Sequence, residues 1–138
     1  MLAVDETLNS PREMETGIAW FLWLDDERYP PECLSHPTPR IAPEWRIARN
    51  VADAKWMVER LGIPIYMSLD HDLGDRKFTG MDFVRWLCDH IMENNIRVPE
   101  GFSYRIHSMN PVGAENMERY LKNFFEDWYL PMEGKGGV

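Results

Sequence analysis

Two short acidic stretches in this sequence could hold a divalent cation. Each follows a run of large apolar residues, Ile18–Leu24 in the first case and Ile63–Leu69 in the second. The acidic side chains are Asp25 and Asp26 after the first run, and Asp70 and Asp72 after the second. Carboxylates that lie close together repel one another unless a cation or a shared proton intervenes. Because hard cations prefer oxygen ligands, we expect these residues to bind Mg²⁺ or Mn²⁺, with Asp72 as a fourth ligand or as a partner of the other three.

Two histidines accompany these acids. His71 lies between Asp70 and Asp72, and His107 follows FSYRI in a later predicted strand. Histidine titrates near neutral pH without a large perturbation, so His107 and His71 are the candidates for general acid and general base. Asp70 completes the predicted catalytic set. A structural role is the alternative for each histidine.

Four further side chains could bind an anionic substrate. The guanidinium of Arg28 suits phosphate oxygens, although a salt bridge to a neighbouring acid is an alternative role. Ser108 could donate to a phosphate oxygen, and Asn110 stands at a predicted helix start, where backbone amides attract anions. Lys77 lies in a loop between two glycines and could close over a ligand, or simply be solvated.

Strands and helices alternate along the predicted chain. Apolar patterns predict strands over 18–24, 44–50, 63–69 and 102–111, and helices over 51–62, 81–95 and 111–128. Asn50 and Asn110 are predicted N-caps, and Pro111 suits a first helical position. Five prolines over 29–43 exclude a regular helix there. Such alternation predicts an α/β fold with a parallel sheet, whose strands deliver the acidic residues to one edge.

The composition is that of a single globular domain. With 44% hydrophobic residues, a chain of 138 residues can bury one core. We expect a flexible arm over 1–17, one domain over 18–130 and a flexible tail over 131–138. The net charge of −8 argues against binding to double-stranded nucleic acid, because that affinity depends on Lys and Arg.

The sequence also predicts the compartment. No apolar stretch is long enough to cross a membrane, and the N-terminus does not resemble a signal peptide. We therefore expect a cytoplasmic protein that does not bind membranes. Cys33 and Cys88 are expected to be free thiols, with one disulfide as the alternative.

The residues at the predicted strand ends resemble those of receiver (response-regulator) domains. In that superfamily an acidic pair ends the first strand, a phosphoacceptor aspartate ends the third and a hydroxyl residue ends the fourth. Asp25 and Asp26 match the pair, Asp70 matches the acceptor, Ser108 matches the hydroxyl position, and Gly80 matches the glycine that opens the next helix. The resemblance implies a receiver-like (flavodoxin-like) three-layer sandwich, reduced to about four parallel strands in the order 2-1-3-4.

Two departures from the receiver pattern point to a divergent branch. No fifth strand with its lysine is predicted after Phe125, and a proline-rich loop replaces the first crossover helix. The motifs LDDER, SLDHDLG, TGMDFVRWL and HSMNPVGAENM are more similar to the receiver-like family proposed to process cyclic phosphates. That resemblance implies a metal-dependent activity on a cyclic phosphate of a nucleotide or nucleotide-derived metabolite, often in phage and bacterial conflict systems.

Three functions follow as hypotheses. The first is a phosphoesterase that opens a cyclic phosphate and binds a small phosphorylated ligand. The second is a signalling receiver that accepts a phosphoryl group on Asp70; the missing lysine argues against it, since that cation couples the acceptor's charge to conformational change. The third is a non-catalytic module that binds a nucleotide or docks a protein partner, which the sequence does not identify.

Overall fold

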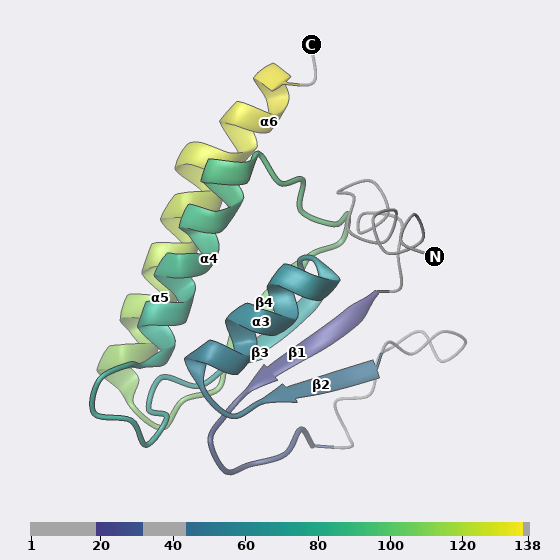
Figure 1. Cartoon of the computed structure of the whole chain (residues 1–138). Coiled ribbons are helices and arrows are strands. Elements are labelled where there is room, and N and C mark those ends of the chain that lie inside the picture. Colours follow the sequence, from purple (N-terminus) through teal and green to yellow (C-terminus); the bar gives the residue numbers. More distant parts are fainter. Residues whose placement is uncertain (1–18, 32–43, 137–138) are drawn as a thin grey trace, which may run out of the picture.

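The described chain consists of parallel strands connected by helices and loops (Figure 1). A computed structural model describes residues 19–31 and 44–136. The strands are β1 (Trp20–Leu24), β2 (Glu44–Ala48), β3 (Tyr66–Leu69) and β4 (Ser103–Ile106). The helices are α3 (Val51–Leu61), α4 (Gly80–Asn94), α5 (Pro111–Asn123), the π-helix η3 (Phe124–Tyr129) and α6 (Leu130–Gly136).

The four strands form one sheet in the order β2-β1-β3-β4, and each neighbouring pair is parallel. This confirms the predicted order 2-1-3-4 and the receiver-like α/β class. All five residues of β1 are buried, as expected for a central strand. Leu24 pairs with Ala48 of β2 and Leu69 of β3, and Leu69 pairs with Ile106 of β4. The four strands therefore end at the same edge of the sheet.

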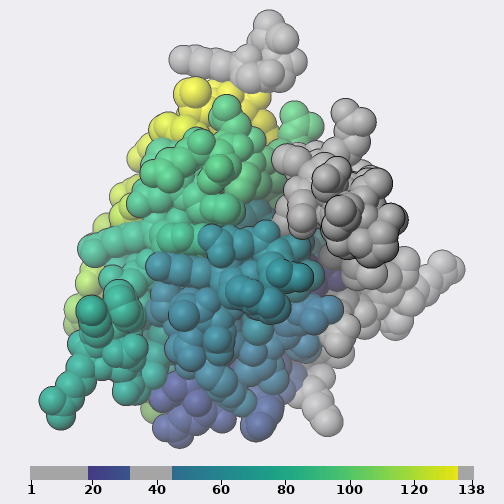
Figure 2. Space-filling view, in the orientation of Figure 1, coloured from purple at the N-terminus to yellow at the C-terminus, as the bar shows by residue number. Residues whose placement is uncertain are grey.

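The hydrophobic core lies between the sheet and one layer of helices. Leu22 and Leu24 of β1 pack in a single cluster with Met67 of β3 and with buried residues of α3, α4 and α5. Figure 1 shows these three helices on one side of the sheet, and Figure 2 shows α3 covering the strands in that view. Because side chains alternate along a strand, Phe21 and Trp23 point to the opposite face. The described residues place no helix on that face, where a three-layer sandwich has one.

Local sequence signals explain where the helices begin and end. The side chain of Asn50 accepts a hydrogen bond from the backbone N–H of Asp53, so it caps α3 as predicted. The side chain of Asn110 accepts one from Gly113 in the same way, with Pro111 in the first turn of α5. Helix α4 begins with a capping box, in which Thr79 and Asp82 bond each other's backbone, a motif that the sequence analysis did not identify.

The C-terminal helices extend further than predicted. The expected helix over 111–128 continues through η3 and α6 to Gly136, so the residues predicted as a tail from 131 are helical up to that point. The predicted arm over 1–17 and most of the proline-rich loop lie outside the described residues. Among the helices described, none is both long and apolar enough to cross a membrane.

Candidate metal centre

Three side chains that could share a cation meet at the carboxyl edge of the sheet. Asp25 follows β1, Asp70 follows β3 and His107 follows β4. One carboxylate oxygen from each aspartate and one ring nitrogen of the histidine all lie within 4.8 Å of one another. The backbone continues the sheet for one more residue, because Asp70 N–H donates to Leu24 C=O and His107 N–H donates to Leu69 C=O. The prediction that Asp25 and Asp70 come together is therefore confirmed.

The Asp25 carboxylate is 1% exposed and surrounded by donors. Its Oδ1 accepts hydrogen bonds from the backbone N–H groups of Glu27 (2.9 Å) and Arg28 (2.7 Å). Its Oδ2 accepts from Nε of Arg28 at 2.9 Å and lies 3.0 Å from Nε2 of His107. Burial alone would raise the pKa of Asp25, but the two backbone donors, His107 and the charge of Arg28 outweigh it and lower the pKa. Asp25 is therefore ionised at neutral pH.

Asp70 has spare acceptor capacity. Its side chain is 8% exposed, and Oδ2 lies 3.4 Å from a terminal nitrogen of Arg28. Among the described residues, no donor reaches Oδ1. Helix α4 begins against the backbone of Asp70, because Gly80 N–H donates to the carbonyl of His71 and a Cβ on Gly80 would lie 2.0 Å from the Asp70 carbonyl oxygen. The glycine lets the helix start directly against the backbone of Asp70.

The His107 ring is held on three sides. Nδ1 lies 2.7 Å from Oγ of Ser68, and Nε2 lies 3.0 Å from Oδ2 of Asp25. The ring stacks on Trp23 with centroids 4.0 Å apart and planes 7° from parallel. Burial lowers the pKa of His107, and the nearby carboxylates of Asp25 and Asp70 only partly offset it. His107 is therefore favoured as a neutral imidazole.

The Arg28 side chain bridges the carboxylates of Asp25 and Asp70. A salt bridge to a neighbouring acid is the alternative role that the sequence suggested for Arg28. Besides its contacts with Asp25 and Asp70, its guanidinium donates to the backbone carbonyl of His107 at 3.3 Å. The Arg28 backbone carbonyl accepts hydrogen bonds from Trp23 Nε1 and from Arg49. Its side chain is 47% exposed, so part of it lies toward solvent.

The remaining predicted ligands lie apart from this group. An Asp26 carboxylate oxygen lies close to Gly74, and neither Asp26 nor Asp72 belongs to the three-residue group found among the described residues. Asp72 accepts from the side-chain amide of Asn110, and its Oδ1 lies 2.7 Å from Nδ1 of His71. These two hydrogen bonds lower the pKa of Asp72. The roles of Asp26 and Asp72 as metal ligands stay predictions.

The other predicted substrate contacts surround this edge without converging on one atom. Ser108 Oγ accepts from the backbone N–H of Asn110, so part of its capacity is used in the turn before α5. The His71 ring packs against Gly113, where a Cβ would lie 2.4 Å from the ring. Lys77 is exposed, and its ammonium lies 5.4 Å from the Phe78 ring centroid. Catalytic and binding roles for His71, Ser108, Asn110 and Lys77 also stay predictions.

Two residues of the site have no counterpart in the sequence-based prediction. Ser68 is completely buried within β3, and Trp23 is buried within β1. Their positions two residues before Asp70 and Asp25 place them on the same sheet face as each other. The alternation of side chains along a strand is the sequence signal that could have placed Ser68 and Trp23 on this face. It does not indicate that the His107 ring packs against them.

The donor set fits a divalent cation. Two buried carboxylates supply hard oxygen ligands, and an imidazole is acceptable to Mn²⁺ and to softer metals. These residues do not by themselves select one metal.

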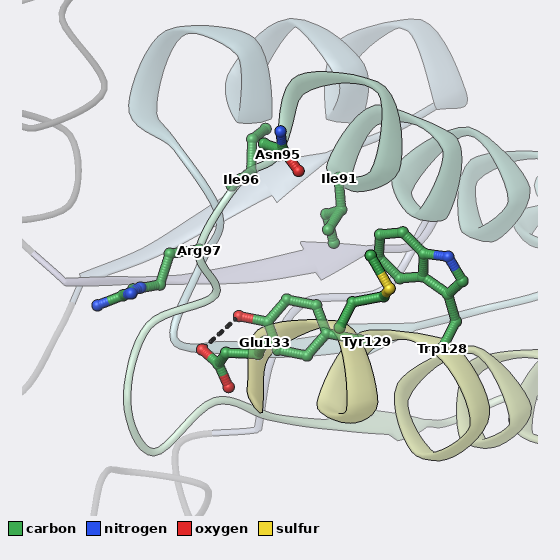
Figure 3. Close-up of a pocket in the computed structure, with 8 residues that line it drawn as sticks. Ile91, Asn95, Ile96, Arg97, Trp128, Tyr129 and Glu133 are labelled. Carbon is green, nitrogen blue, oxygen red and sulfur yellow. Dashed lines mark hydrogen bonds between the residues drawn. The ribbon is translucent and has the colours of Figure 1, made fainter. Parts of the chain in front are cut away.

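Two hollows lie away from Asp25 and Asp70, near the amino ends of the strands. One, of about 500 Å³, is lined by residues from the end of α4, η3 and α6 (Figure 3). There the hydroxyl of Tyr129 donates to Glu133. The other, of about 580 Å³, adjoins the loop before β4. The polar residues at this end form no metal-ligating group within the described part of the chain.

Comparison with known proteins agrees with the geometry. A family model described as the cyclic-phosphate processing receiver domain matches residues 20–123, which include the four described strands and α3, α4 and α5. Searches of curated proteins and of solved structures gave no match. Since the match covers well over half of the sequence, the chain belongs to the cyclic-phosphate processing receiver domain family.

Proposed function

We propose that this protein is a metal-dependent phosphoesterase that opens a cyclic phosphate of a nucleotide or a nucleotide-derived metabolite. The family description, cyclic-phosphate processing, supports this class of substrate. The observation that carries the proposal is the meeting of Asp25, Asp70 and His107 at the carboxyl edge of the sheet, where parallel α/β sheets bind their ligands. Mg²⁺ is the favoured cation, with Mn²⁺ as the alternative.

The two aspartates would hold the cation. A bound divalent cation would act as a Lewis acid on a phosphate oxygen and lower the pKa of a bound water. Asp70 presents an oxygen without a hydrogen-bond donor among the described residues, and Asp25 is held as an anion by its four donors. In this proposal Asp26 and Asp72 would supply further carboxylate oxygens to the cation.

The neighbouring side chains would bind and orient the phosphate. Arg28 lies against both carboxylates and its side chain is half-exposed, so its guanidinium would contact phosphate oxygens of a bound substrate. Ser108, Asn110 and the first amides of α5 would offer further donors in the segment that follows β4. Lys77 would approach from the loop before α4.

Opening a cyclic phosphodiester also needs a proton acceptor and a proton donor. His71 and His107 are the two histidines at this edge. Nδ1 of His71 is engaged by Asp72, and its Nε2 has no partner among the described residues, which leaves that nitrogen free to exchange a proton with a substrate.

The test is hydrolysis of a panel of nucleoside and sugar cyclic phosphates with Mg²⁺ or Mn²⁺, followed by chromatography. We expect ring opening that a chelator abolishes. Asp25→Asn and Asp70→Asn should lose both turnover and the cation binding measured by calorimetry. Asp53→Asn is the matched control, because Asp53 is an exposed aspartate in the first turn of α3. Undiminished hydrolysis by the Asp70→Asn protein would refute the assigned site.

A receiver-type phosphoacceptor is the second candidate, since Asp70 matches the acceptor position and its Oδ1 accepts no hydrogen bond from the described residues. Incubation with acetyl phosphate or beryllofluoride tests it by mass spectrometry. Stoichiometric modification at Asp70 would favour that function. Tight binding of a cyclic phosphate without turnover would instead favour a non-catalytic binding module. The proposal includes a cytoplasmic location and a setting in phage or bacterial conflict, which the family resemblance suggests.

A further inference from the structure

We propose that His107 is a positioning residue: Ser68 fixes the proton of His107 on Nε2, and His107 uses it to hold Asp25 instead of ligating a hard cation or acting as the general base. The part concerning the cation rests on the proposed function. The part concerning the tautomer does not.

The first argument comes from Ser68. This residue is 0% exposed, and Nδ1 of His107 is the one hydrogen-bond partner that its hydroxyl has in the described chain. A buried hydroxyl that only accepted would leave its own proton without a partner, at a cost of about 1–3 kcal/mol. The Ser68 O–H therefore donates to Nδ1, which must then carry a lone pair and no proton.

The second argument comes from the opposite side of the ring. Nε2 lies 3.0 Å from Oδ2 of Asp25, and an ionised carboxylate can only accept. A hydrogen bond at this distance requires the proton to be on Nε2. Ser68 and Asp25 thus select the same neutral tautomer independently.

The third argument concerns which group leaves when a cation approaches. Asp25 already accepts from two backbone N–H groups, Arg28 Nε and His107 Nε2, which fills about the four lone-pair directions of a carboxylate. The two backbone donors are the N–H groups of Glu27 and Arg28, which are fixed by the course of the chain after β1. His107 is 12% exposed and stacked on Trp23, whereas the Arg28 side chain is 47% exposed. The geometry favours exchange of Arg28 for the cation while His107 keeps its bond.

This arrangement changes the assignment of roles among the predicted catalytic residues. His107 has no free ring nitrogen, because one accepts from Ser68 and the other donates to Asp25. Hydrogen bonds of this kind from neighbouring side chains orient metal-binding carboxylates in many sites. The general base would then be His71.

The test uses protein with nitrogen-15-labelled histidine and long-range proton–nitrogen correlation spectra, with His107→Gln to assign the signals. In the metal-free wild type we expect the proton on Nε2 and an Nδ1 signal displaced by hydrogen bonding. In Ser68→Ala the Nδ1 signal should move to that of an unbonded nitrogen, and Ser68→Thr, which keeps the hydroxyl, should restore it. Saturation with Mg²⁺ should leave the wild-type proton on Nε2.

Three outcomes would overturn the proposal: a proton on Nδ1 of metal-free wild type, an Nδ1 signal unmoved in Ser68→Ala, or transfer of the proton to Nδ1 on Mg²⁺ binding. The first can be read from the wild type alone, so a variant that fails to fold does not prevent the test. If no cyclic phosphate is hydrolysed but the tautomer is as stated, the proposed function fails and the positioning role stands.

A binding measurement separates the role of a ligand from that of a positioning residue. We expect His107→Ala to weaken Mg²⁺ binding about tenfold to a hundredfold, as is usual for a residue that orients a ligand. Asp70→Asn should abolish it. Equal, complete loss in both variants would show that His107 ligates the cation directly.

Discussion

Arg28 and Asp70, which are 42 positions apart in the sequence, are joined by a contact of 3.4 Å between a guanidinium nitrogen and Oδ2. The same guanidinium donates to Asp25, so one positive charge faces both buried carboxylates. Without it, two anions would lie close together in a region from which water is largely excluded. Arg28 thus neutralises the edge of the sheet in the absence of a cation.

Replacing Arg28 should separate its contribution to stability from its effect on cation binding. In Arg28→Gln we expect the metal-free unfolding free energy to fall by about 1 kcal/mol, since the pair is partly exposed. We expect Mg²⁺ affinity to rise about fivefold, because the cation no longer competes with a resident charge. Urea denaturation and calorimetry measure the two quantities. Arg119→Gln, an exposed arginine on α5, is the control, and weaker Mg²⁺ binding by Arg28→Gln would contradict the competition.

Gly80 should be intolerant of any side chain. A Cβ at this position would lie 2.0 Å from the Asp70 carbonyl oxygen and 2.9 Å from Cε of Met117. The backbone oxygen cannot yield as a flexible side chain can, so we expect Gly80→Ala to lose about 2 kcal/mol of unfolding free energy. Glu93→Ala, on the exposed face of the same helix, should change little. Equal denaturation midpoints for the two variants would show that α4 can shift at no cost.

The sequence allowed the main features of this edge to be predicted because they follow from strand physics. Asp25 and Asp70 are the first polar residues after buried apolar runs, and parallel strands bring such residues to one edge. Asn110 before Pro111 is a strong start signal for a helix, and α5 begins there. These local and periodic signals can be interpreted without knowledge of long-range contacts.

The parts of the site that could not be predicted depend on the orientation of individual side chains, which no local sequence pattern indicates. Asp25 and Asp26 are equivalent by position, yet only Asp25 turns its carboxylate back to accept the N–H groups of Glu27 and Arg28. Ser68 is an ordinary polar residue in a strand until His107 folds over it. The π-helix after α5 lies where Phe125 packs against the rings of Phe102 and Tyr104, a tertiary contact that no local pattern indicates.

The hydroxyl of Tyr129 should contribute to stability at the opposite end of the molecule. It accepts a hydrogen bond from the buried backbone N–H of Val98 at 2.7 Å and donates to Glu133. Tyr129→Phe would leave that N–H without a partner, so we expect a loss of about 1–2 kcal/mol in chemical denaturation. Tyr29→Phe removes a hydroxyl from a side chain that is 70% exposed and should have no measurable effect. An unchanged unfolding free energy in the Tyr129→Phe protein would mean that water replaces the hydroxyl as the partner of the Val98 N–H.

His90 should make the fold sensitive to mild acid. Burial against Trp86 lowers the pKa of His90 below its ordinary value of 6.5, although Glu59 and Glu93 favour the charged form. Between the folded pKa and 6.5 the unfolded chain binds more protons, so the stabilising effect of a neutral His90 is complete above that window and lost as the pH falls through it. Unfolding free energies measured above and below 6.5 should differ less in His90→Phe than in the wild type. An identical pH dependence in both proteins would exclude His90 as the source.

Cys88 should resist thiol reagents while the protein is folded. Burial, and to a lesser extent the charge of Asp89, raises the pKa of its thiol to about 12, so almost no reactive thiolate exists at the mildly alkaline pH of a labelling assay. In a Cys33→Ser protein, Cys88 is the single remaining cysteine. We expect negligible reaction with a disulfide reagent in native buffer and one equivalent in urea, followed by absorbance. Rapid stoichiometric labelling of the native protein would show that helix α4 opens at this position far more readily than its fully buried inner face indicates.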